Sequence, residues 1–348
     1  MKVLYLTPWY PSERDAMAGL FVEKHVQAVQ AQGVDVRVIH SLDWRDMWRQ
    51  WRELKRTWGL PDVVQLNVIQ KQGLLALWLK RRYGIPYVII EHWSGYLPEN
   101  NSVKPHGLHT RLMQAVCRNA EIVMPVSLRL RQAMQDLGFA AKQWDKINNV
   151  VDDFFFERAE SRELRAESGK FTFLHISCFD ERAKNVRGLL RAAKMLSEKQ
   201  EGWQLVIVGT GQDYQDVRAY ADNLGLPEGL LAWRGELTPR EVAAEFDLAD
   251  VFILPSNYEN APVVLSESIV KGVPIISTRV GGIPEMVNAD NGRLVTPRND
   301  DELAEAMAYM LAHHGDYNKD AIRANGQQYS FAEVGKKLKG IYENVSGH

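Results

Sequence analysis

The chain has 348 residues, of which 45% are hydrophobic and 25% are charged, and its net charge is −2. This composition excludes a disordered chain, a collagen-like repeat and a small disulfide-rich scaffold, and no apolar run approaches the roughly 18–20 residues that span a bilayer. The length favours two domains at roughly 100–200 residues each, and the two widely separated cysteines, Cys117 and Cys178, are typical of a reducing cytoplasm.

In the first half, short apolar runs rich in β-forming residues alternate with amphipathic segments. The runs predict strands at Lys2–Thr7, Val34–His40, Val63–Leu66, Tyr87–Glu91 and Ile122–Val126. The amphipathic segments predict helices near Leu20–Ala31, Leu74–Arg82, Leu108–Asn119 and Ser127–Leu137. This alternation indicates a parallel sheet with crossover helices.

The charged stretch Asp152–Lys170 is expected to connect two domains, because the same pattern restarts after it. The second half predicts strands near Phe171–Ser177, Gln204–Val208, Val251–Leu254 and Pro274–Thr278. It predicts helices near Val186–Glu198, Tyr214–Leu224, Pro239–Phe246, Pro262–Lys271, Asp301–Ala312 and Phe331–Asn344. The predicted fold class is therefore α/β, with two Rossmann-like, doubly wound parallel-sheet domains facing each other across a cleft. Functional residues are expected directly after strands, because open parallel sheets bind ligands at the carboxyl ends of their strands.

The segment from Val251 to Gly272 is the most informative in the chain. A buried strand ends at Leu254, a loop follows, and a helix is expected to start at Pro262. The helical spacing predicts that Glu267 lies on the same apolar face as Val263, Val264 and Val270, where a carboxylate needs a partner. Sugar hydroxyls are one such partner, and an Arg or Lys is the plain alternative. The helix start at Asn260–Val263 offers N–H groups and a positive dipole end to a phosphate.

The residues of this region resemble those of the retaining glycosyltransferases of family 4, which have the GT-B fold. The resemblance rests on Asp250, Pro255-Ser256, Tyr258-Glu259-Asn260, Glu267, Gly272-Val273-Pro274 and Gly281-Gly282-Ile283-Pro284-Glu285. It implies that Glu259 lies against the donor sugar, that Glu267 holds the ribose hydroxyls, and that the backbone of Asn260, Ala261, Pro262 and Val263 faces the sugar and phosphates. It also implies an acceptor-side domain at 1–155, a donor-side domain at 156–328, and a C-terminal helix at 329–348 that packs back toward the first domain.

Lys184 lies between a predicted strand and a predicted helix, where a cation can neutralise the diphosphate that leaves the donor. A solvated loop lysine is the plain alternative. The family usually has an arginine six positions before this lysine, but Cys178 occupies that position, and Arg182 is a candidate substitute.

Three further residues are implied by the resemblance. Gly209, in Val208-Gly209-Thr210-Gly211, resembles part of the nucleotide-side loop, with a tight turn as the alternative. Gly19 ends a long loop after the first strand that would approach the donor phosphates, with a simple helix entry as the alternative. His92 follows a strand and resembles a histidine that lies near the donor sugar, although a lone histidine is usually structural.

The predicted activity is metal-independent, retaining transfer of a hexose-type sugar from a nucleoside-diphosphate sugar to a glycan or lipid-linked acceptor, in cell-surface polysaccharide synthesis. UDP- and GDP-sugars are both candidate donors, and no cofactor is expected. A metal is not expected, because no paired Asp-x-Asp motif adjoins a plausible sugar site. Two alternatives stay open: a nucleotide-sugar epimerase of the same fold, and a non-catalytic protein that binds a nucleotide sugar.

Residues 1–170 carry a net charge of +5 and residues 171–348 a net charge of −7. No nucleic-acid partner is expected, because there is no concentrated basic domain. The segment Trp44–Trp58 contains four of the ten tryptophans, placed at helical spacing, and carries a net charge of +3. Packing on the first sheet is one interpretation. The other is attachment to an anionic membrane, which would place this cytoplasmic protein on the inner face of the cell membrane.

Overall fold

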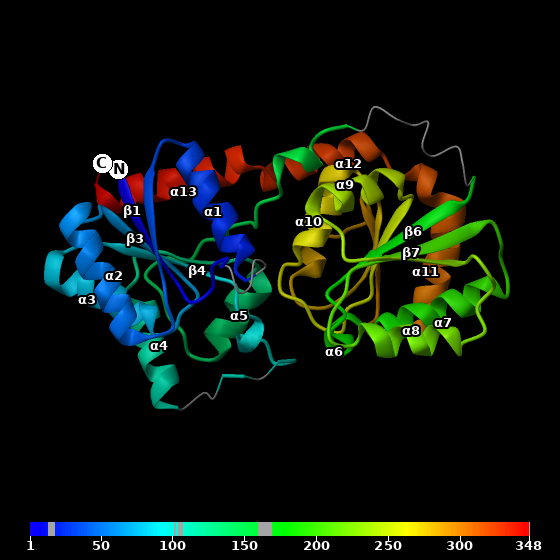
Figure 1. Cartoon of the computed structure of the whole chain (residues 1–348), viewed down its shortest axis with the longest axis horizontal. Helices are drawn as coiled ribbons and strands as arrows, with labels where there is room; N and C mark the ends of the chain where they lie inside the picture. The colour runs from blue at the N-terminus through cyan, green and yellow to red at the C-terminus, as the bar shows by residue number, and fades with distance from the viewer. Residues whose placement is uncertain (13–17, 101, 104–106, 159–168, 348) are drawn as a thin grey trace. The chain divides into compact units, whose positions relative to one another are not determined.

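A computed structural model describes residues 1–12, 18–100, 102–103, 107–158 and 169–347 (Figure 1). The chain divides into two compact units: unit 1 is Met1–Val150 with Gln328–His348, and unit 2 is Val151–Gln327. Unit 1 therefore contains both ends of the chain, and the chain first leaves it after Val150 rather than after residue 155. No helix in the described ranges is long and apolar enough to cross a membrane.

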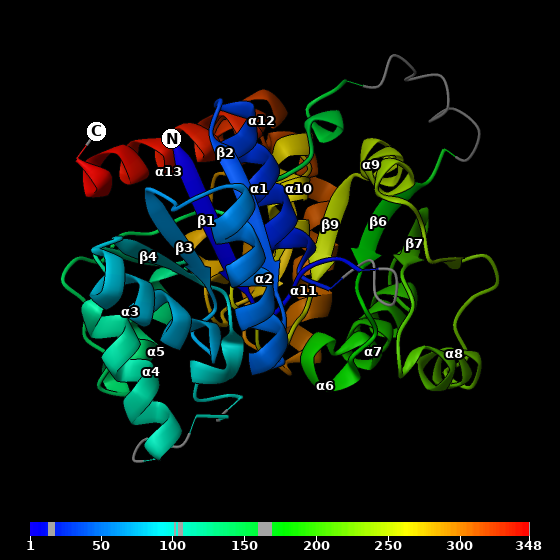
Figure 2. The same cartoon turned by 60° about the vertical axis from the view of Figure 1, so that its left-hand side comes forward.

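Unit 1 is built on five parallel strands in the spatial order β2-β1-β3-β4-β5 (Figure 2). The strands are β1 (Lys2–Thr7), β2 (Asp35–His40), β3 (Val63–Asn67), β4 (Tyr87–Glu91) and β5 (Val123–Pro125). In the register of β1, Leu4 lies beside Arg37 of β2 and Val64 of β3. Strands β3 and β4 are buried along their whole length, which explains why their sequences are mainly apolar runs rather than alternating patterns.

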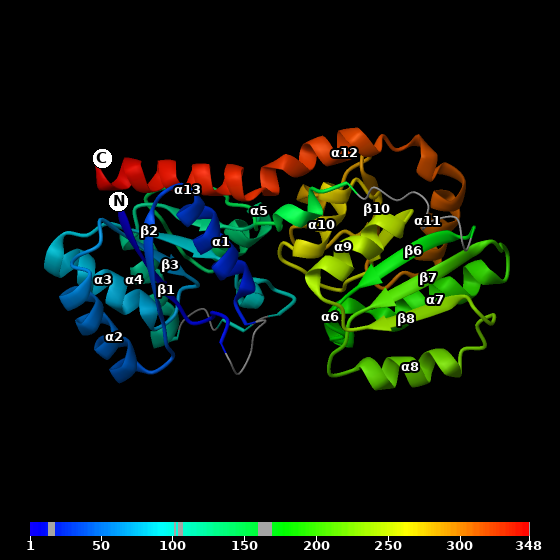
Figure 3. The ribbon, with the colours of Figure 1, turned by 45° about the horizontal axis from the view of Figure 1, so that its top comes forward.

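The described residues of unit 1 form six α-helices: α1 (Leu20–Ala31), α2 (Trp44–Thr57), α3 (Gln72–Tyr83), α4 (Leu108–Asn119), α5 (Leu128–Asp136) and α13 (Phe331–Ser346). The C-terminal helix α13 packs along α1 (Figure 3). Gly335 permits this close approach, since a Cβ there would lie 2.3 Å from the carbonyl oxygen of Ala28. The buried Tyr342 donates to Gln65 Oε1 at 3.0 Å and shares a 2.8 Å hydrogen bond with the hydroxyl of Tyr5. Helix α13 therefore contributes to the core of unit 1.

The tryptophans of Trp44–Trp58 do not form one exposed stripe. Trp51 is 2% exposed, so the middle of α2 packs into unit 1. Trp48 and Trp58 are half-buried, whereas Trp44 is 42% exposed. The interpretation of all four tryptophans as a membrane-facing stripe is therefore wrong at Trp51, because α2 must use this side chain to cover the sheet.

Unit 2 is built on six parallel strands in the order β11-β10-β9-β6-β7-β8. The strands are β6 (Phe171–Ile176), β7 (Trp203–Val208), β8 (Leu231–Gly235), β9 (Val251–Leu254), β10 (Ile275–Thr278) and β11 (Gly292–Val295). The sequence analysis missed β8 and β11, which are the two edge strands. Both are incompletely buried, so neither presents the continuous apolar run by which the inner strands were identified.

The α-helices of unit 2 are α6 (Glu181–Lys184), α7 (Val186–Ser197), α8 (Tyr214–Asp222), α9 (Pro239–Leu248), α10 (Val263–Lys271), α11 (Asp300–His313) and α12 (Lys319–Gly326). Helices α7 and α11 pack together and bury Leu189, Leu190, Met307 and Met310 in the core. The short helices α6 and α12 were not predicted, because four and eight residues are too few for a clear helical periodicity.

Each sheet has a point at which the chain reverses the direction in which it adds strands. In unit 1 this point lies between β1 and β3, and in unit 2 it lies between β6 and β9. Doubly wound sheets bind ligands at the carboxyl ends of the strands beside such a switch point. We therefore expect a functional site at the loops after β1, β6 and β9.

Candidate functional site

The loop after β6 is held by its own polar side chains. Asp180 accepts a hydrogen bond from the backbone N–H of Ala183 and caps α6. Asn185 ends this short helix in a left-handed conformation, with φ 53°. Glu181 then accepts hydrogen bonds from the N–H groups of Val186 at 2.8 Å and Arg187 at 3.1 Å, at the start of α7. These contacts fix the backbone on both sides of Lys184.

The loop after β9 is fastened to the loop after β6. The N–H of Asn257 donates to the carbonyl oxygen of Ala183 at 2.7 Å. Its side-chain amide donates to the carbonyl oxygen of Arg182 at 3.0 Å. Asn185 donates in turn to the carbonyl oxygen of Pro255 at 3.4 Å. The two loops beside the switch point of unit 2 therefore form one connected structure.

Lys184 and Glu259 form an ion pair at the centre of this structure. Their side chains are only 17% and 11% exposed. Ser256 donates a hydrogen bond to Glu259 Oε1 at 2.9 Å, and Thr278 donates to the carbonyl oxygen of Ser256 at 2.5 Å. Burial opposes the charge on Lys184, but the attraction of Glu259 outweighs it and raises the pKa of the lysine. The structure thus brings together two residues that the sequence analysis singled out separately.

Two glycines let neighbouring loops approach these residues closely. A Cβ on Gly281 would lie 1.6 Å from the carbonyl oxygen of Glu259, and the N–H of Gly282 donates to the carbonyl oxygen of Asn260 at 2.9 Å. Gly209 has φ 115°, and a Cβ there would lie 1.9 Å from the carbonyl oxygen of Ser177. Both positions require glycine for packing, so Gly209 has a structural reason to be present.

Arg182 and Cys178 are both exposed. The guanidinium of Arg182 lies 5.5 Å from the ring centre of Tyr258, in a cation–π arrangement. Its positive charge is therefore located beside the loop that carries Glu259. The family usually has an arginine at the position of Cys178. That Arg182 supplies the missing charge stays a prediction.

The start of α10 differs from the sequence prediction in one respect. Val263, Val264 and Glu267 are half-buried, whereas Val270 is 3% exposed. The predicted face is therefore not buried at Val263, Val264 and Glu267, because the buried positions of α10 are Leu265, Ser266 and residues 268–271. The carboxylate of Glu267 remains within reach of solvent and of a ligand.

The residues just before α10 form the end of the loop after β9. Asn260 is buried to 9% exposure, and Ala261 and Pro262 are half-buried. The N–H of Leu265 donates to the carbonyl oxygen of Pro262 at 3.1 Å, whereas the first N–H groups of a helix, here those of Val263 and Val264, come before the regular i to i−4 hydrogen bonds. Together with the positive end of the helix dipole they favour a negative ligand at this end of α10.

In unit 1 the structure brings the start of α1 close to His92. Gly19 precedes α1 with φ 68°, and a Cβ there would lie 2.4 Å from the carbonyl group of Trp9. The ring of His92 lies 4.3 Å from that of Phe21 and 5.5 Å from that of His25. Burial, together with the nearby His25, lowers the pKa of His92 well below its usual value. His92 is therefore a neutral imidazole at physiological pH.

Glu91 precedes His92, and the sequence analysis did not single it out. Its carboxylate is fully buried and accepts hydrogen bonds from the N–H groups of Ile69 (2.9 Å), His92 (3.0 Å) and Trp93 (2.9 Å), and from the hydroxyl of Tyr96 (3.2 Å). Burial raises the pKa of Glu91 to about 7 despite these donors. A glutamate at the end of a fully buried strand was the available signal, since such a carboxylate must have partners.

Ser256 was also missed as a partner of Glu259. In the sequence, Ser256 is only one of the residues that carry the family resemblance. Its hydrogen bond to Glu259 depends on how the loop after β9 turns, which the sequence pattern does not tell. No group of three or more His, Cys, Asp or Glu side chains in the described part of the chain is placed to hold a metal ion.

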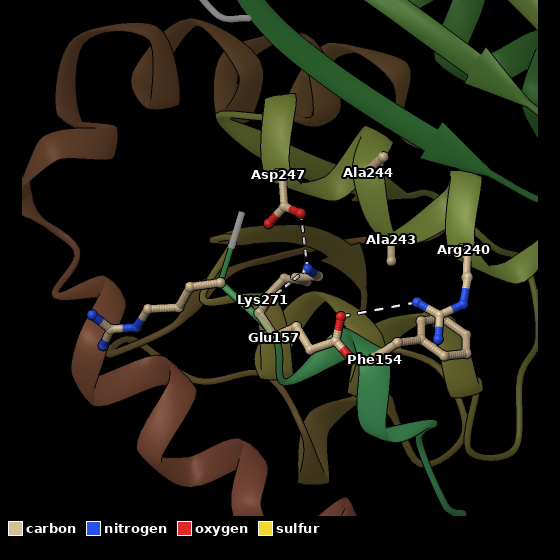
Figure 4. Close-up of a pocket in the computed structure, with 8 residues that line it drawn as sticks. Phe154, Glu157, Arg240, Ala243, Ala244, Asp247 and Lys271 are labelled. Carbon is tan, nitrogen blue, oxygen red and sulfur yellow. Dashed lines mark hydrogen bonds and ion pairs between the residues drawn. The ribbon is translucent and has the colours of Figure 1, made fainter. Parts of the chain in front are cut away.

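A pocket of about 150 Å³ lies away from the loops after β6 and β9 (Figure 4). Lys271 reaches into its floor, where it donates to Asp247 at 2.8 Å and to the carbonyl oxygen of Glu157 at 3.1 Å. Arg240 stacks 4.8 Å from the ring centre of Phe154 in its wall. Since Lys271 is the last residue of α10, this pocket lies at the opposite end of the helix from Val263. Its cations are already paired, so it serves to anchor residues 154–158 on α9 and α10.

The sequence matches two family models. Residues 156–328 match the model described as glycosyl transferases group 1, and residues 6–149 match the model described as glycosyl transferase 4-like domain. Together these ranges include all the loops described above.

Known proteins similar to the chain agree with these matches. The putative teichuronic acid biosynthesis glycosyltransferase TuaC of Bacillus subtilis (strain 168) is 23% identical over 358 residues, which cover 88% of each chain. Among solved structures, sucrose-phosphate synthase from Thermosynechococcus elongatus has a TM-score of 0.79 at 18% identity and covers all of both chains. Anabaena HepE in complex with UDP-glucose has a TM-score of 0.76 at 18% identity, covering 99% of this chain and 100% of that one. The predicted fold class, two parallel-sheet domains of the GT-B type, is confirmed.

Proposed function

The chain belongs to the group 1 glycosyltransferases with the GT-B fold, and from this premise we propose the reaction that it catalyses. A hexose-type sugar passes from a nucleoside-diphosphate sugar to a glycan or lipid-linked acceptor, and its anomeric configuration is retained. The observation that carries the proposal is the pairing of Lys184 and Glu259 at the switch point of unit 2, next to the start of α10.

The charges of this site suit departure of a diphosphate. Lys184 and the N-terminal turn of α10 supply positive charge where negative charge grows in the transition state. Arg182, exposed beside Tyr258, is a second cation for the same phosphates. Because Glu259 holds Lys184, the lysine is preorganised and is not a randomly oriented surface cation.

The remaining residues of unit 2 are assigned to the donor. Glu267 accepts hydrogen bonds from ribose hydroxyls, and Glu259 lies against the sugar. The backbone at Asn260, Ala261, Pro262 and Val263 faces the sugar and phosphates, and Gly209 lines the nucleotide side. UDP-glucose in the complex of the similar HepE structure makes UDP-sugars the first donors to test, with GDP-sugars next.

Gly19 and His92 are assigned to the donor from unit 1. A neutral imidazole both donates and accepts a hydrogen bond, so His92 suits a sugar hydroxyl better than a phosphate. Gly19 keeps the loop after β1 tight against Trp9, which would let its backbone approach the phosphates. Unit 1 is also the proposed acceptor side.

Retention follows from attack by the acceptor hydroxyl on the face that the diphosphate leaves, through an oxocarbenium-like transition state. Glu259 is the proposed catalytic carboxylate, and in this scheme no covalent intermediate forms on it. Lys184 and the helix dipole supply the positive charge that a divalent metal would otherwise bring, so the reaction is proposed to need no metal and no cofactor.

The proposed role is synthesis of a cell-surface polysaccharide or glycolipid. The similarity to TuaC, described as a glycosyltransferase of teichuronic acid biosynthesis, supports this role. The proposed location is the cytoplasm, at the inner face of the cell membrane, where lipid-linked acceptors are accessible.

A thermal-shift screen with nucleoside-diphosphate sugars tests the donor. A ligand that binds the native state raises the melting temperature by an amount that grows with the logarithm of its concentration relative to Kd, so one UDP- or GDP-sugar should give a larger shift than its free nucleotide at the same concentration. Chromatography of the incubated donor then separates three outcomes. Transfer supports the proposal, isomerisation of the donor sugar indicates an epimerase, and an unchanged donor with every acceptor indicates a binding protein.

A further inference from the structure

Helices α2 and α3 lie side by side in unit 1 (Figures 1 and 3). The rings of Trp48 on α2 and Trp78 on α3 meet edge to face at 4.7 Å. Lys55 on α2 donates to the hydroxyl of Tyr83 on α3 at 3.0 Å. We refer to the exposed side chains of residues 42–57 and 81–82, with the aromatic rings between the helices, as the α2–α3 surface.

The outward side of α2 is a stripe of arginines. Arg45, Arg49, Arg52 and Arg56 are all exposed, and their spacing of three or four residues places them on one face of the helix. Met47 and Trp51, on the opposite face, are buried. The two acidic residues of α2, Asp46 and Glu53, lie to one side of the stripe, and Asp46 pairs with Arg49.

Helix α3 extends the positive charge. Arg81 and Arg82 in its last turn are exposed, and this helix contains no acidic residue. With Lys55, which is also exposed, the α2–α3 surface carries seven exposed basic residues and three acidic ones, the helix-capping Asp43 together with Asp46 and Glu53, a net of +4. The excess is local, because the whole chain has a net charge of −2.

Apolar side chains protrude at the amino end of α2. Leu42 is 61% exposed and Trp44 is 42% exposed. The ring of Trp44 packs edge to face on Trp48 at 5.6 Å, so the exposed indole continues a row of aromatic rings into the seam between the helices. Exposed leucine and tryptophan beside a row of arginines is the composition of a helix that lies in a bilayer interface.

We propose that the α2–α3 surface docks on an anionic membrane. The arginine stripe would contact acidic lipid headgroups, and Leu42 and Trp44 would enter the boundary between headgroups and acyl chains. A dissolved acidic polymer would use the arginines but would gain little from an exposed leucine and indole. The binding itself is independent of the reaction, and only its use in reaching a lipid-linked acceptor rests on the proposed function.

The test is co-sedimentation of the full-length protein with vesicles of phosphatidylcholine alone and with phosphatidylglycerol added. The native chain should bind the anionic vesicles at least about tenfold more strongly than the neutral ones, and added salt should weaken this binding. The variant Trp44→Ala, Arg45→Glu, Arg52→Glu changes only exposed side chains of the surface. It should fold normally and lose the preference for anionic vesicles.

A matched control is available in unit 2. Tyr309 is 38% exposed, and the exposed Arg293 stacks on it at 4.0 Å. The variant Tyr309→Ala, Arg293→Glu, Lys199→Glu removes one exposed ring and reverses two exposed charges, so its net charge equals that of the α2 variant. It should bind anionic vesicles as the native chain does.

Three results would overturn the proposal: no preference of the native chain for anionic vesicles, equal loss in the α2 variant and the control, or unchanged binding in Trp44→Ala and Leu42→Ser. The last result, with strong binding to a dissolved acidic polysaccharide, would assign the arginines to a polymer instead. Transfer to a soluble acceptor, measured on the same preparations, shows separately whether the proposed function holds.

Discussion

The ion pair between Lys184 and Glu259 joins loops that are 75 residues apart in the sequence. We expect Lys184→Ala to lower kcat about 100-fold or more while changing KM for the donor by less, because charge on the leaving diphosphate is greater in the transition state than in the bound donor. The variant should also lose about 1–3 kcal/mol of unfolding free energy, since Glu259 would keep only Ser256 as a partner at a mostly buried position. Steady-state kinetics and urea unfolding measure the two effects.

Arg182→Ala is the comparison for this variant. Arg182 is exposed, so its loss should leave stability within about 0.5 kcal/mol of the native value. A fall in kcat would indicate that it acts in place of the arginine missing at Cys178. If Lys184→Ala left kcat unchanged, the assignment of this site to the leaving group would be contradicted.

Glu267→Ala should weaken donor binding by about 1.5–3 kcal/mol, which is the usual contribution of a hydrogen bond to a charged group. Because Glu267 is half-buried and not in the core of α10, the variant should fold as the native chain does. Calorimetric titration with the identified donor measures the change. Equal affinity in the two proteins would remove Glu267 from the donor site.

Glu91 makes stability depend on pH. Burial raises its pKa to about 7 in the folded chain, from a usual value of 4.5, so between these two values the native state holds a proton that the unfolded state has released. This group therefore makes stability fall as pH rises through that window. The stability of the native chain relative to Glu91→Gln should decrease by about 3 kcal/mol between pH 5 and pH 8.

Urea unfolding of both proteins at the two pH values measures this difference. Glu121→Gln is a suitable control, because the carboxylate of Glu121 is partly exposed and its pKa is lowered by Lys142 and Lys80 despite some burial. A native-minus-variant difference for Glu91 that is equal at pH 5 and pH 8 would show that the carboxylate is already charged at pH 5.

Some residues of the candidate site were predictable, and others were not. Lys184, Glu259 and His92 all follow predicted strands, where parallel sheets bind ligands, but Glu259 and His92 were singled out by the resemblance to the family 4 glycosyltransferases. The pairing of Lys184 with Glu259 was not predictable, because it depends on β6 and β9 being neighbours in the sheet. The position of Glu267 was misjudged, because helical spacing tells which residues share a face but not which face is buried.

At the scale of elements, the inner strands and the edge strands of unit 1, β2 and β5, were predicted, whereas the edge strands of unit 2 were missed. Strands β1, β3, β4, β6, β7 and β9 are mostly buried and have mainly apolar sequences. Strands β8 and β11 each have one neighbour and are partly exposed, so their sequences contain Arg and Gly instead of a continuous apolar run. Helix α2 was identified from its periodicity, but its buried face is set by contact with the sheet and α3.

Helix α13 is attached to unit 1 by a buried chain of hydrogen bonds. Tyr342→Phe would leave the side-chain oxygen of Gln65 without the donor hydroxyl of Tyr342 and would remove the partner of the Tyr5 hydroxyl. We expect a loss of about 1–3 kcal/mol of unfolding free energy and faster proteolysis near the C-terminus. Lys337→Ala, which removes a half-exposed ion pair with Asp145, should cost less than about 1 kcal/mol. Equal effects of the two changes would contradict this role of Tyr342.

At the scale of the whole molecule, alternation of strands and helices was sufficient to predict two doubly wound domains. The resemblance also implied a C-terminal helix that packs back toward the first domain, and contacts of α13 with α1 and β3 place this segment in unit 1. The unequal charge of the two halves was visible in the sequence, but the structure was needed to locate exposed basic side chains on α2 and α3.

The measurement that tests the central claim most directly is the anomeric configuration of the transferred sugar, determined by NMR on the product of a reaction run in excess EDTA. The account predicts transfer to the acceptor with the configuration of the donor retained, at a rate that EDTA does not change. It would be contradicted by a product of inverted configuration, by isomerised donor without transfer, or by activity that EDTA abolishes and magnesium or manganese restores.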